Sequence, residues 1–183
     1  MAESAEILTT RLRILPFSEA YLTPEYVDWL NDPEVVRYSE QRHRAHTLAS
    51  CRAYCESFRG SPHYFWAIVE RELGLGHIGN MTAYVNAHNR VADLGILIGN
   101  RDAWRKGYAS EAWAIVCDYL FEHADMRKIS AGTLAANIGM LAVMRATGMV
   151  DDGRRSRHSL LDGSETDVIH AAVFKGDWRR GAG

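Results

Sequence analysis

The chain has 183 residues, 47% of them hydrophobic and 24% charged, with a formal net charge of −2. This length favours a single domain, residues 1–183, with a substantial core, and the near-neutral charge argues against a protein that binds duplex nucleic acid through a strongly basic face. No apolar run is long enough to span a membrane, and the start of the chain lacks the apolar core of a signal peptide, so we expect a cytoplasmic protein.

The first third of the chain predicts one strand followed by helical segments. In "LTTRLRILPF", Leu12 and Ile14 alternate with arginines, which is typical of a strand. Apolar residues recur at helical spacing over residues 18–31, "NDPEVVRY" indicates a turn and a short helix over residues 31–38, and another helix is expected over residues 47–58. The polar stretch "RYSEQRHRAH" is expected to form a loop.

The rest of the chain alternates between strand and helix patterns. Three strands are expected in "HYFWAIVE", "GHIGNMTAYV" and "VADLGILIGN", followed by a helix over residues 108–120. "RKISAGTLA" indicates a further strand, residues 137–147 a short helix that Gly148 stops, and the end of the chain a hairpin around Asp162 and Gly163. This order predicts a mixed α/β domain of three layers, with the sheet between helices.

Three cysteines, Cys51, Cys55 and Cys117, are too few and odd in number to suggest a disulfide framework. With His43 and His46, the first two form H-x2-H-x4-C-x3-C, a spacing that matches no common zinc module. We therefore expect no metal site here, and thiols that are buried or half-buried.

Residues 74–79, "GLGHIG", have the spacing G-x-G-x-x-G of dinucleotide-binding proteins. That fingerprint requires a strand before it and a helix opening at its end, whereas a strand-like pattern, "NMTAYV", follows here. A hairpin turn that leads into a strand is the better interpretation, with glycines supplying unusual backbone angles.

The stretch "RDAWRKGYASEAW", residues 101–113, has the context that "GLGHIG" lacks, because it joins an expected strand to an expected helix. Amides at a helix start have no partners inside the helix, and the dipole there favours an anion. The stretch combines small, basic and hydroxyl side chains, namely those of Gly107, Ala109, Arg105, Lys106 and Ser110. From these residues alone, a phosphate site and a plain helix start both remain open.

"LGILIGNRDAWRKGYASEAW", followed by "RKISAGTLAANIGMLAVMRATGM", resembles the GNAT superfamily of acetyl-CoA-dependent N-acetyltransferases, in particular the branch of ribosomal-protein N-terminal acetyltransferases. The family's pyrophosphate loop, [Q/R]-x-x-G-x-[G/A], is matched by residues 104–109 except that Trp104 stands at the first position. The resemblance covers nearly the whole chain. It implies a single mixed, mostly antiparallel sheet with splayed central parallel strands and helices on both faces, and acetyl-CoA as co-substrate without a metal.

In this family acetyl-CoA lies in a gap between two parallel strands, here implied to be residues 92–98 and 128–134. Splayed strands leave backbone groups unpaired, and the pantetheine arm can occupy them. The implied cofactor-binding residues are Leu97, Ile98, Gly99, Trp104, Arg105, Lys106, Gly107, Tyr108, Ala109, Ser110, Asn137 and Arg145. Two of them have alternatives, since Asn137 is also a suitable helix N-cap and Arg145 a suitable solvent-facing arginine.

The implied reaction is direct attack of a neutral amine on the thioester, which needs a donor for the oxyanion and a base for the amine's proton, direct or through water. The backbone N–H near Leu97 or Ile98 is the candidate oxyanion donor. Asp93 is the candidate base, because in a strand it shares a face with Gly95 among many apolar neighbours. The alternatives left open are an ion pair of Asp93 with Arg90, and a base at His63 or His77.

The group that protonates the leaving thiolate is less clear from the sequence. Many family members use a tyrosine in the helix after the asparagine, but Met144 occupies the matching position, and methionine cannot donate a proton. Water, Tyr108 or Ser130 are the remaining candidates. Because a CoA thiolate is only weakly basic, a dedicated acid is not essential.

The acceptor is expected opposite the cofactor, against the early helices and the last hairpin. The candidate residues are Tyr38, Glu40, Arg42, His43 and Tyr84, with His158 and His170 beside them. An ordinary solvated loop is the alternative for residues 37–46. The stretch "GRRSRH", residues 153–158, indicates either a phosphate contact or a polar strand edge.

The expected partner is a small-molecule or peptide amine. We prefer a small amine, such as an amino sugar or a nucleotide-linked amino sugar, over a protein N-terminus, because no clear acidic cluster accompanies the acceptor loop. A non-catalytic acetyl-CoA-binding module is a third hypothesis, which the missing tyrosine favours and Asp93 opposes. Homodimers are common in the family, although no interface is legible in this sequence.

Overall fold

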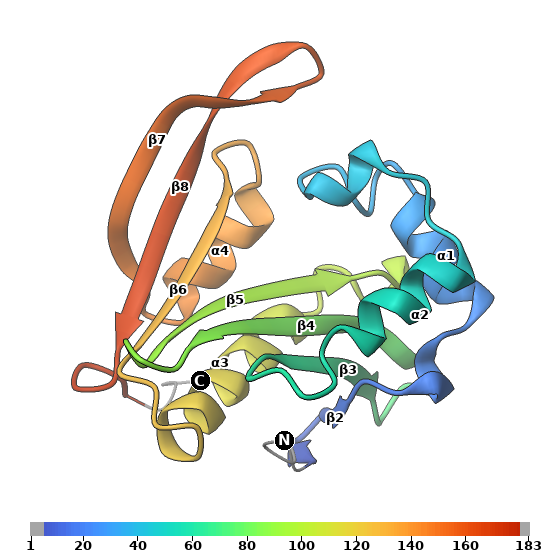
Figure 1. Ribbon diagram of the computed structural model, residues 1–183, viewed down its shortest axis with the longest axis horizontal. Coiled ribbons are helices and arrows are strands. Elements are labelled where there is room, and N and C mark those ends of the chain that lie inside the picture. The colour runs from blue at the N-terminus through green and yellow to red at the C-terminus, as the bar shows by residue number, and fades with distance from the viewer. Residues whose placement is uncertain (1–5, 180–183) are drawn as a thin grey trace.

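The computed structural model describes residues 6–179 and contains an eight-stranded mixed sheet in the order β1-β2-β3-β4-β5-β6-β8-β7 (Figure 1). The strands are β1 (Ile7–Leu8), β2 (Leu12–Pro16), β3 (Tyr64–Glu70), β4 (Gly76–Asn86), β5 (Val91–Ile98), β6 (Lys128–Leu134), β7 (Val150–Leu161) and β8 (Ser164–Phe174). The helices are α1 (Pro24–Asn31), α2 (Leu48–Glu56), α3 (Tyr108–Glu122) and α4 (Ile138–Ala146), with 3-10 turns η1 (Glu19–Tyr21), η2 (Glu40–His43) and η3 (Arg101–Ala103). Within this described part, no helix combines the length and the apolar character needed to cross a bilayer.

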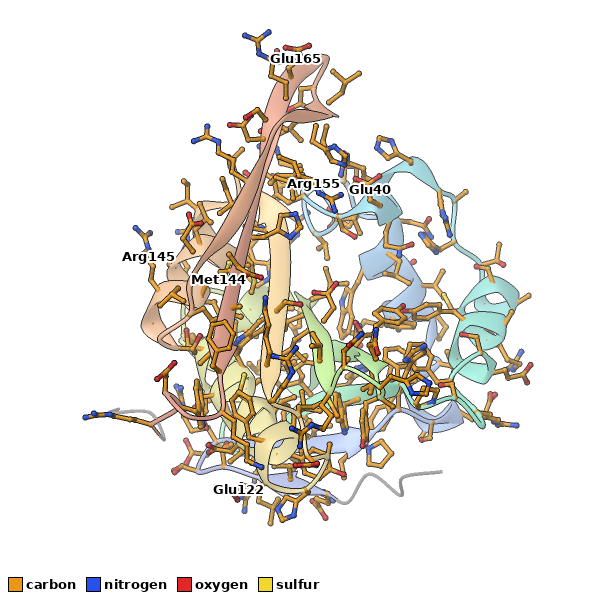
Figure 2. All side chains as sticks on the ribbon, turned by 60° about the vertical axis from the view of Figure 1, so that its left-hand side comes forward. Glu40, Glu122, Met144, Arg145, Arg155 and Glu165 are labelled. Atoms are coloured by element: carbon orange, nitrogen blue, oxygen red, sulfur yellow. The ribbon has the colours of Figure 1, made fainter. Side chains whose placement is uncertain are left out.

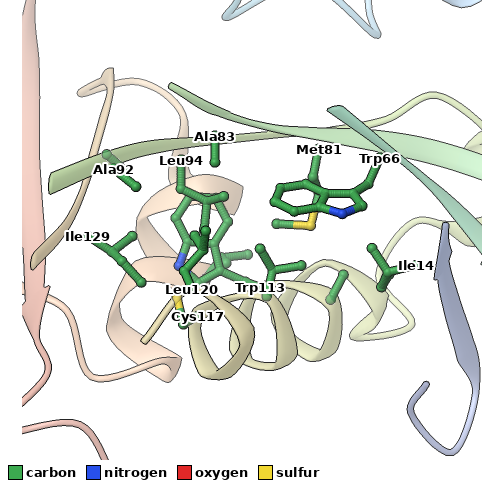
Figure 3. Close-up of a cluster of buried hydrophobic side chains, with 14 of the residues drawn as sticks. Ile14, Trp66, Met81, Ala83, Ala92, Leu94, Trp113, Cys117, Leu120 and Ile129 are labelled. Atoms are coloured by element: carbon green, nitrogen blue, oxygen red, sulfur yellow. The ribbon is translucent and has the colours of Figure 1, made fainter. Parts of the chain in front are cut away.

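Helices cover both faces of the sheet, and each face has its own apolar cluster. α3 and α4 pack on one face, where Trp66, Met81 and Trp113 are fully buried (Figure 3). α1 and α2 cover the other face around Tyr26 and Phe65. The predicted three layers and the implied mixed sheet are confirmed, and the sheet between two packed faces gives the site a rigid base.

The central strands β5 and β6 form a parallel pair that extends over only three positions. Residues 91–93 lie opposite residues 128–130, and the pairing ends there. β6 continues along β8, and β5 continues along β4. The two strands therefore part after Asp93, as predicted, and leave a gap between them.

The N-terminal helical region differs from its prediction in two places. Residues 18–31 form η1 and α1 rather than one helix, because the Thr23 hydroxyl caps a new helix start. The short helix expected within residues 31–38 is replaced by turns. The Asp32 carboxylate accepts the Glu34 N–H at 2.9 Å, a local bond that competes with helix formation.

The glycine-rich residues 74–79 form a turn and then enter β4, as predicted, and no helix follows them. The carboxylate of Glu70 organises the turn by accepting several of its backbone N–H groups. At Gly79, a Cβ would lie 2.2 Å from the Leu97 carbonyl oxygen. Glycine is required there because β4 and β5 approach each other closely.

Candidate active site

A cavity of about 1570 Å³ occupies the gap between β5 and β6. The start of α3 and one side of α4 line one end of it. The other end lies between the N-terminal segment that carries Glu40 and the β7–β8 hairpin that carries Arg155 (Figure 2). Usual ligand pockets have ~300–1,000 Å³, so this cavity has room for two substrates that meet at the gap.

The start of α3 is the clearest feature of the cofactor end. Gly107, with a φ of 79°, precedes the helix and has no side chain to cap it. The hydrogen bond at the N-terminal end of the helix is donated by the Glu111 N–H to the Gly107 carbonyl. The N–H groups of residues 108–110 are therefore left without helical partners, and these residues line the cavity. This arrangement binds anions such as phosphate.

The charges around this helix start also favour an anion. Glu111, in the first turn, is paired with Arg11 at 2.6 Å and accepts further hydrogen bonds, so its charge is balanced. Arg105 lines the cavity, but Lys106 does not. The Lys106 carbonyl accepts a hydrogen bond from Arg11 at 2.9 Å, which ties the loop to β2. Of the two basic residues of this loop that were predicted to contact the cofactor, only Arg105 lines the cavity.

Trp104, the residue that departs from the family's loop pattern, connects the loop to β5. Its indole Nε1–H donates to the Ile98 carbonyl at 2.8 Å, and the residue lines the cavity. The bond occupies one backbone acceptor at the end of β5. Trp104 therefore has a positioning role that the sequence pattern did not indicate.

The alternating hydrogen-bonding direction of the residues of β5 determines which of their backbone N–H groups face the gap. The Gly99 N–H donates to the Ile78 carbonyl at 2.9 Å. Hydrogen-bonding direction alternates along an antiparallel pair, so the odd-numbered residues of β5 bond to β4 and the even-numbered residues face the gap. The Leu97 N–H therefore points toward β4, whereas the N–H groups of Ile96 and Ile98 face the cavity.

Two predicted cofactor contacts on β5 need correction as a result. Leu97 lines the cavity, but its amide points away from the gap and is unsuitable as an oxyanion donor. Gly99 lies outside the lining, and its amide is already bonded to Ile78. A Cβ at Gly99 would lie 2.1 Å from the Trp29 ring, so packing against α1 explains the glycine.

Asn137 and Arg145, predicted on and near α4, have different surroundings. Asn137 lines the cavity, yet its side chain caps α4 through the Met140 N–H at 3.1 Å and donates to Thr133 Oγ1 at 3.0 Å. The N-cap interpretation of Asn137 is confirmed. Arg145 lies outside the cavity, and its Nε donates to the Leu141 carbonyl of its own helix. Arg145 is thus a solvent-facing arginine outside the cavity lining, and its contact with the cofactor stays a prediction.

The candidates for the general acid differ in their position relative to the cavity and to Asp93. Met144 is buried in the core and does not line the cavity, whereas Met140, one turn earlier, does. The Tyr108 hydroxyl points to Glu70 Oε1 at 3.4 Å, away from the gap. Ser130 Oγ lies 3.4 Å from Asp93 Oδ1, at the point where the strands part. Ser130 therefore lies beside the candidate base, although it is not itself among the residues that line the cavity.

Asp93 lines the cavity at the last paired position of β5 and β6. The predicted alternative, an ion pair with Arg90, is not formed, because Arg90 pairs with Asp125 at 3.1 Å. Burial by surrounding protein raises the pKa of Asp93, while the hydrogen bond from Ser130 and the nearby His170 act in the opposite direction. A carboxyl with a raised pKa, open to a cavity, is suited to act as a base.

His170 is brought to the same cavity from β8. It lies opposite Gly132 of β6, and a Cβ at Gly132 would be 3.1 Å from its ring. Its Nε2 is buried and has no hydrogen-bond partner among the described residues. Strand alternation places Val168 on the same face, and both residues line the cavity. Sequence reasoning indicated the hairpin but not which face of β8 turns toward the gap.

The other histidines considered as bases have structural roles. His77 packs among aromatic rings, lies outside the cavity and is bonded to the Gly79 carbonyl at 2.9 Å. Burial lowers the pKa of His77 to about 4. His63 Nδ1 accepts the Val85 N–H at 3.0 Å. Neither imidazole is available to the gap.

The predicted acceptor residues divide into two groups. Tyr38, Glu40, Arg42 and His43 line the far end of the cavity. Arg42 also donates to the Leu160 carbonyl at 3.2 Å, which connects the N-terminal segment to the hairpin. Tyr84 does not line the cavity, since it is 44% exposed and its hydroxyl lies 2.7 Å from the Tyr54 hydroxyl. Tyr84 is therefore removed from the acceptor set.

The cysteines and the histidines near them do not form a metal site in the described part of the chain. All three thiols are free; Cys51 and Cys117 are buried and Cys55 is half-buried, as expected. Residues 6–179 contain no group of three or more histidine, cysteine or acidic side chains arranged to hold a metal ion.

A family model described as "Acetyltransferase (GNAT) domain" matches residues 11–150. The chain therefore belongs to the GNAT family, and it is an acetyl-CoA-dependent N-acetyltransferase. The uncapped start of α3 and the gap-facing amides of β5 fit the diphosphate and pantetheine of this co-substrate. A comparison with curated proteins finds no significant match.

Solved structures of low sequence identity share the fold. Spermidine N-acetyltransferase from Vibrio cholerae, in complex with CoA and spermine, has a TM-score of 0.82 and 16% identity over 92% of this chain and 98% of that one. The ribosomal L7/L12 α-N-protein acetyltransferase RimL, in complex with coenzyme A, has a TM-score of 0.82 and 15% identity over 93% and 98%. A GNAT-family acetyltransferase from Bacillus anthracis has a TM-score of 0.79 and 20% identity over 94% and 99%. The first two of these neighbours are named for different amines, spermidine and a ribosomal protein, so the fold by itself leaves the acceptor class open.

Proposed function

We propose that this chain acetylates the primary amine of a small molecule, such as an amino sugar or a nucleotide-linked amino sugar. The observation that carries the proposal is the continuity of one cavity. It runs from the start of α3, through the strand gap at Asp93, to polar side chains of the N-terminal segment and the hairpin. An acyl donor and a small acceptor can meet in it without a long peptide groove.

In the proposed reaction, acetyl-CoA supplies the activated acetyl group. The N–H groups of residues 108–110 bind its diphosphate, and the gap-facing N–H groups of Ile96 and Ile98 bind its pantetheine end and the developing oxyanion. Ile98 is five residues from Asp93, roughly 17 Å along a strand, so Ile96 is the better oxyanion donor.

Asp93 removes the proton of the incoming ammonium through water, and its raised pKa makes it a stronger base than an aspartate with the ordinary pKa. The CoA thiolate takes its proton from water or from Ser130, which lies beside Asp93. The missing tyrosine is thus compatible with turnover, because a thiol is a good leaving group even without a dedicated acid.

A protein N-terminal acetyltransferase is the second candidate, supported by the structural similarity to the RimL fold, and a non-catalytic acetyl-CoA-binding module is the third. We propose the cytoplasm as the location, since all three thiols are free and acetyl-CoA is a soluble co-substrate. A homodimer stays a prediction from the family.

The test measures acetyl-CoA binding by calorimetry and thiol release with a panel of amines. Gly107→Glu puts a carboxylate and a side chain beside the diphosphate at a position with positive φ, so binding should fall by about 100-fold or more. Gly60→Glu is the matched control, because Gly60 also has a positive φ, of 72°, a Cβ there meets nothing within 4 Å, and the residue does not line the cavity. Undiminished binding in Gly107→Glu would refute the diphosphate site. Binding without thiol release on any amine would favour the non-catalytic module.

A further inference from the structure

The acidic side chains at the acceptor end of the cavity are balanced, with one exception. Glu34 pairs with Arg101 at 2.6 Å, and Glu40 pairs with Arg42 at 3.2 Å. Asp93 is the acidic lining residue that has no ion pair within the described chain. Binding a polyamine requires several unpaired carboxylates, whereas Asp93 is the one unpaired carboxylate among the described residues that line the cavity.

The basic side chains at the same end are not balanced. In the stretch "GRRSRH", Arg154 pairs with Asp167 and Arg157 with Glu165 at 3.7 Å. Arg155 lines the cavity, and its side chain has no ion pair or hydrogen bond with another side chain or backbone group of residues 6–179. A guanidinium left without a partner in a substrate cavity is suited to bind a carboxylate or a phosphate in a bidentate manner.

The strand register explains why Arg155, rather than its neighbours, points into the cavity. Arg155 lies opposite Val168, which is on the same face of β8 as His170, and all three line the cavity. Beyond Arg155 the register of β7 shifts before Ser159, and Asp167 holds this irregularity through Arg154 and the Arg157 N–H at 2.6 Å. The irregularity brings the Arg154 side chain and the Arg157 backbone N–H to Asp167, while the Arg157 side chain turns to Glu165 and the Arg155 side chain has no such partner.

We propose that the acceptor is a small amine that carries an anionic group, a phosphate or a carboxylate, and that Arg155 binds this group while the amine lies at the Asp93 end. The inference rests on the proposed transferase function and names the acceptor class of the same cavity. A polycationic amine is disfavoured at this site, because its charges would lie beside Arg155 and the other basic side chains of the hairpin and N-terminal segment.

The separation of the two ends restricts the acceptor further. Asp93 and Arg155 are three strand spacings apart, from β5 through β6 and β8 to β7, ~5 Å each, and four residues apart along β8, ~3.4 Å each. An arginine side chain bridges only part of this distance. An amino sugar with a phosphate on a distant carbon fits, whereas an α-amino acid, with both groups on one carbon, is too short.

The first experiment compares kcat/KM for four probes: glucosamine, glucosamine 6-phosphate, spermidine, and a peptide with acidic residues after its N-terminus. The phosphorylated sugar should exceed glucosamine by about tenfold or more, the effect of one charge-assisted hydrogen-bonded contact. Preference for glucosamine or spermidine would overturn the inference, and preference for the peptide would overturn its small-molecule part. Failure of glucosamine 6-phosphate either to react or to bind the acetyl-CoA complex would also overturn it.

The second experiment uses Arg155→Gln with the control Arg157→Gln, which removes the same charge from the same strand outside the cavity. Arg155→Gln should raise KM for glucosamine 6-phosphate by about tenfold, with kcat, KM for acetyl-CoA and turnover of glucosamine unchanged. Arg155→Lys should restore part of the loss, and Arg157→Gln should change KM by less than about twofold. Equal effects of the two Gln variants would refute the assignment of Arg155. Acetyl-CoA binding is measured in each variant, so failure of this inference is distinct from failure of the transferase proposal.

Discussion

The two ends of the cavity present different chemistry to their ligands. The cofactor end offers mainly backbone N–H groups, from residues 108–110 and from the gap-facing edge of β5. The acceptor end, between residues 34–43 and the β7–β8 hairpin, offers charged and polar side chains. Backbone groups are common to all sequences, whereas side chains change with each substitution. The family can therefore be recognised from the cofactor end, whereas we expect the choice of acceptor to depend on the side chains of the acceptor end.

Replacing the candidate base should give the largest effect at the acceptor end. Asp93→Asn keeps the size of the side chain but removes the proton acceptor, so kcat should fall by ~10²–10⁴-fold. The affinity for acetyl-CoA, measured by calorimetry, should be unchanged, since the backbone end is intact. Asp125→Asn, at an exposed ion pair outside the cavity, is the control. Turnover near the wild-type rate would eliminate Asp93 as the base.

The pH dependence of kcat/KM and of stability gives a second test of Asp93 as the base. Burial raises the pKa of Asp93, so kcat/KM should fall as the pH decreases through that raised value, and this limb should be missing in Asp93→Asn. The raised pKa also means that the folded state favours the neutral carboxyl. Its contribution to stability is present below the unfolded pKa and lost as the pH rises through the folded one. Asp93→Asn should therefore have a higher Tm than the wild type at neutral pH, with a smaller difference in acid.

A smaller effect is expected where one side chain supports the backbone end. Trp104→Phe removes the indole donor to the Ile98 carbonyl, a bond of about 1 kcal/mol, so KM for acetyl-CoA should rise about fivefold. Trp178→Phe removes a comparable bond, to Asp118 at 2.6 Å, away from the cavity. If both variants change KM equally, the effect is one of general stability and not of the loop.

The smallest effects should come from predicted cofactor-binding basic residues that lie outside the cavity lining. Lys106→Gln and Arg145→Gln lie outside the cavity, so each should change KM for acetyl-CoA by less than about twofold. Arg105→Gln, inside it, should have the larger effect. Larger effects of Lys106→Gln or Arg145→Gln than of Arg105→Gln would mean that side-chain charges outside the cavity, and not backbone N–H groups, contribute most to acetyl-CoA binding.

The order and type of most elements followed from local patterns. Alternation of apolar residues with arginines indicated β2, and strand-like segments separated by turn signals indicated β3 to β5. Helical spacing indicated α3, and Gly148 and Gly163 marked the end of α4 and the hairpin turn. The errors occurred where a polar side chain bonded to its own backbone. The Asp32 carboxylate replaced a predicted helix by turns, and Thr23 started a new helix inside a predicted one.

The site was only partly predictable, for a physical reason that differs from residue to residue. Gly107 could be predicted as part of the candidate diphosphate site because a glycine just before a helix leaves the first backbone N–H groups of that helix without a capping side chain. Gly99 and Leu97 were misjudged because their availability depends on the hydrogen-bonding phase of β5 against β4. Tyr84 was misjudged because its hydroxyl is bonded to Tyr54, which lies 30 residues earlier in the chain.

The sequence by itself determined the family, the layered α/β architecture and the uncapped helix start, since these depend on residue type and spacing along one segment. The tertiary structure decided which strand edge faces the gap, that Asp93 lacks an arginine partner, and that Arg155 points toward the cavity. Those features depend on strand register and on ion pairs between distant segments, which no local pattern contains.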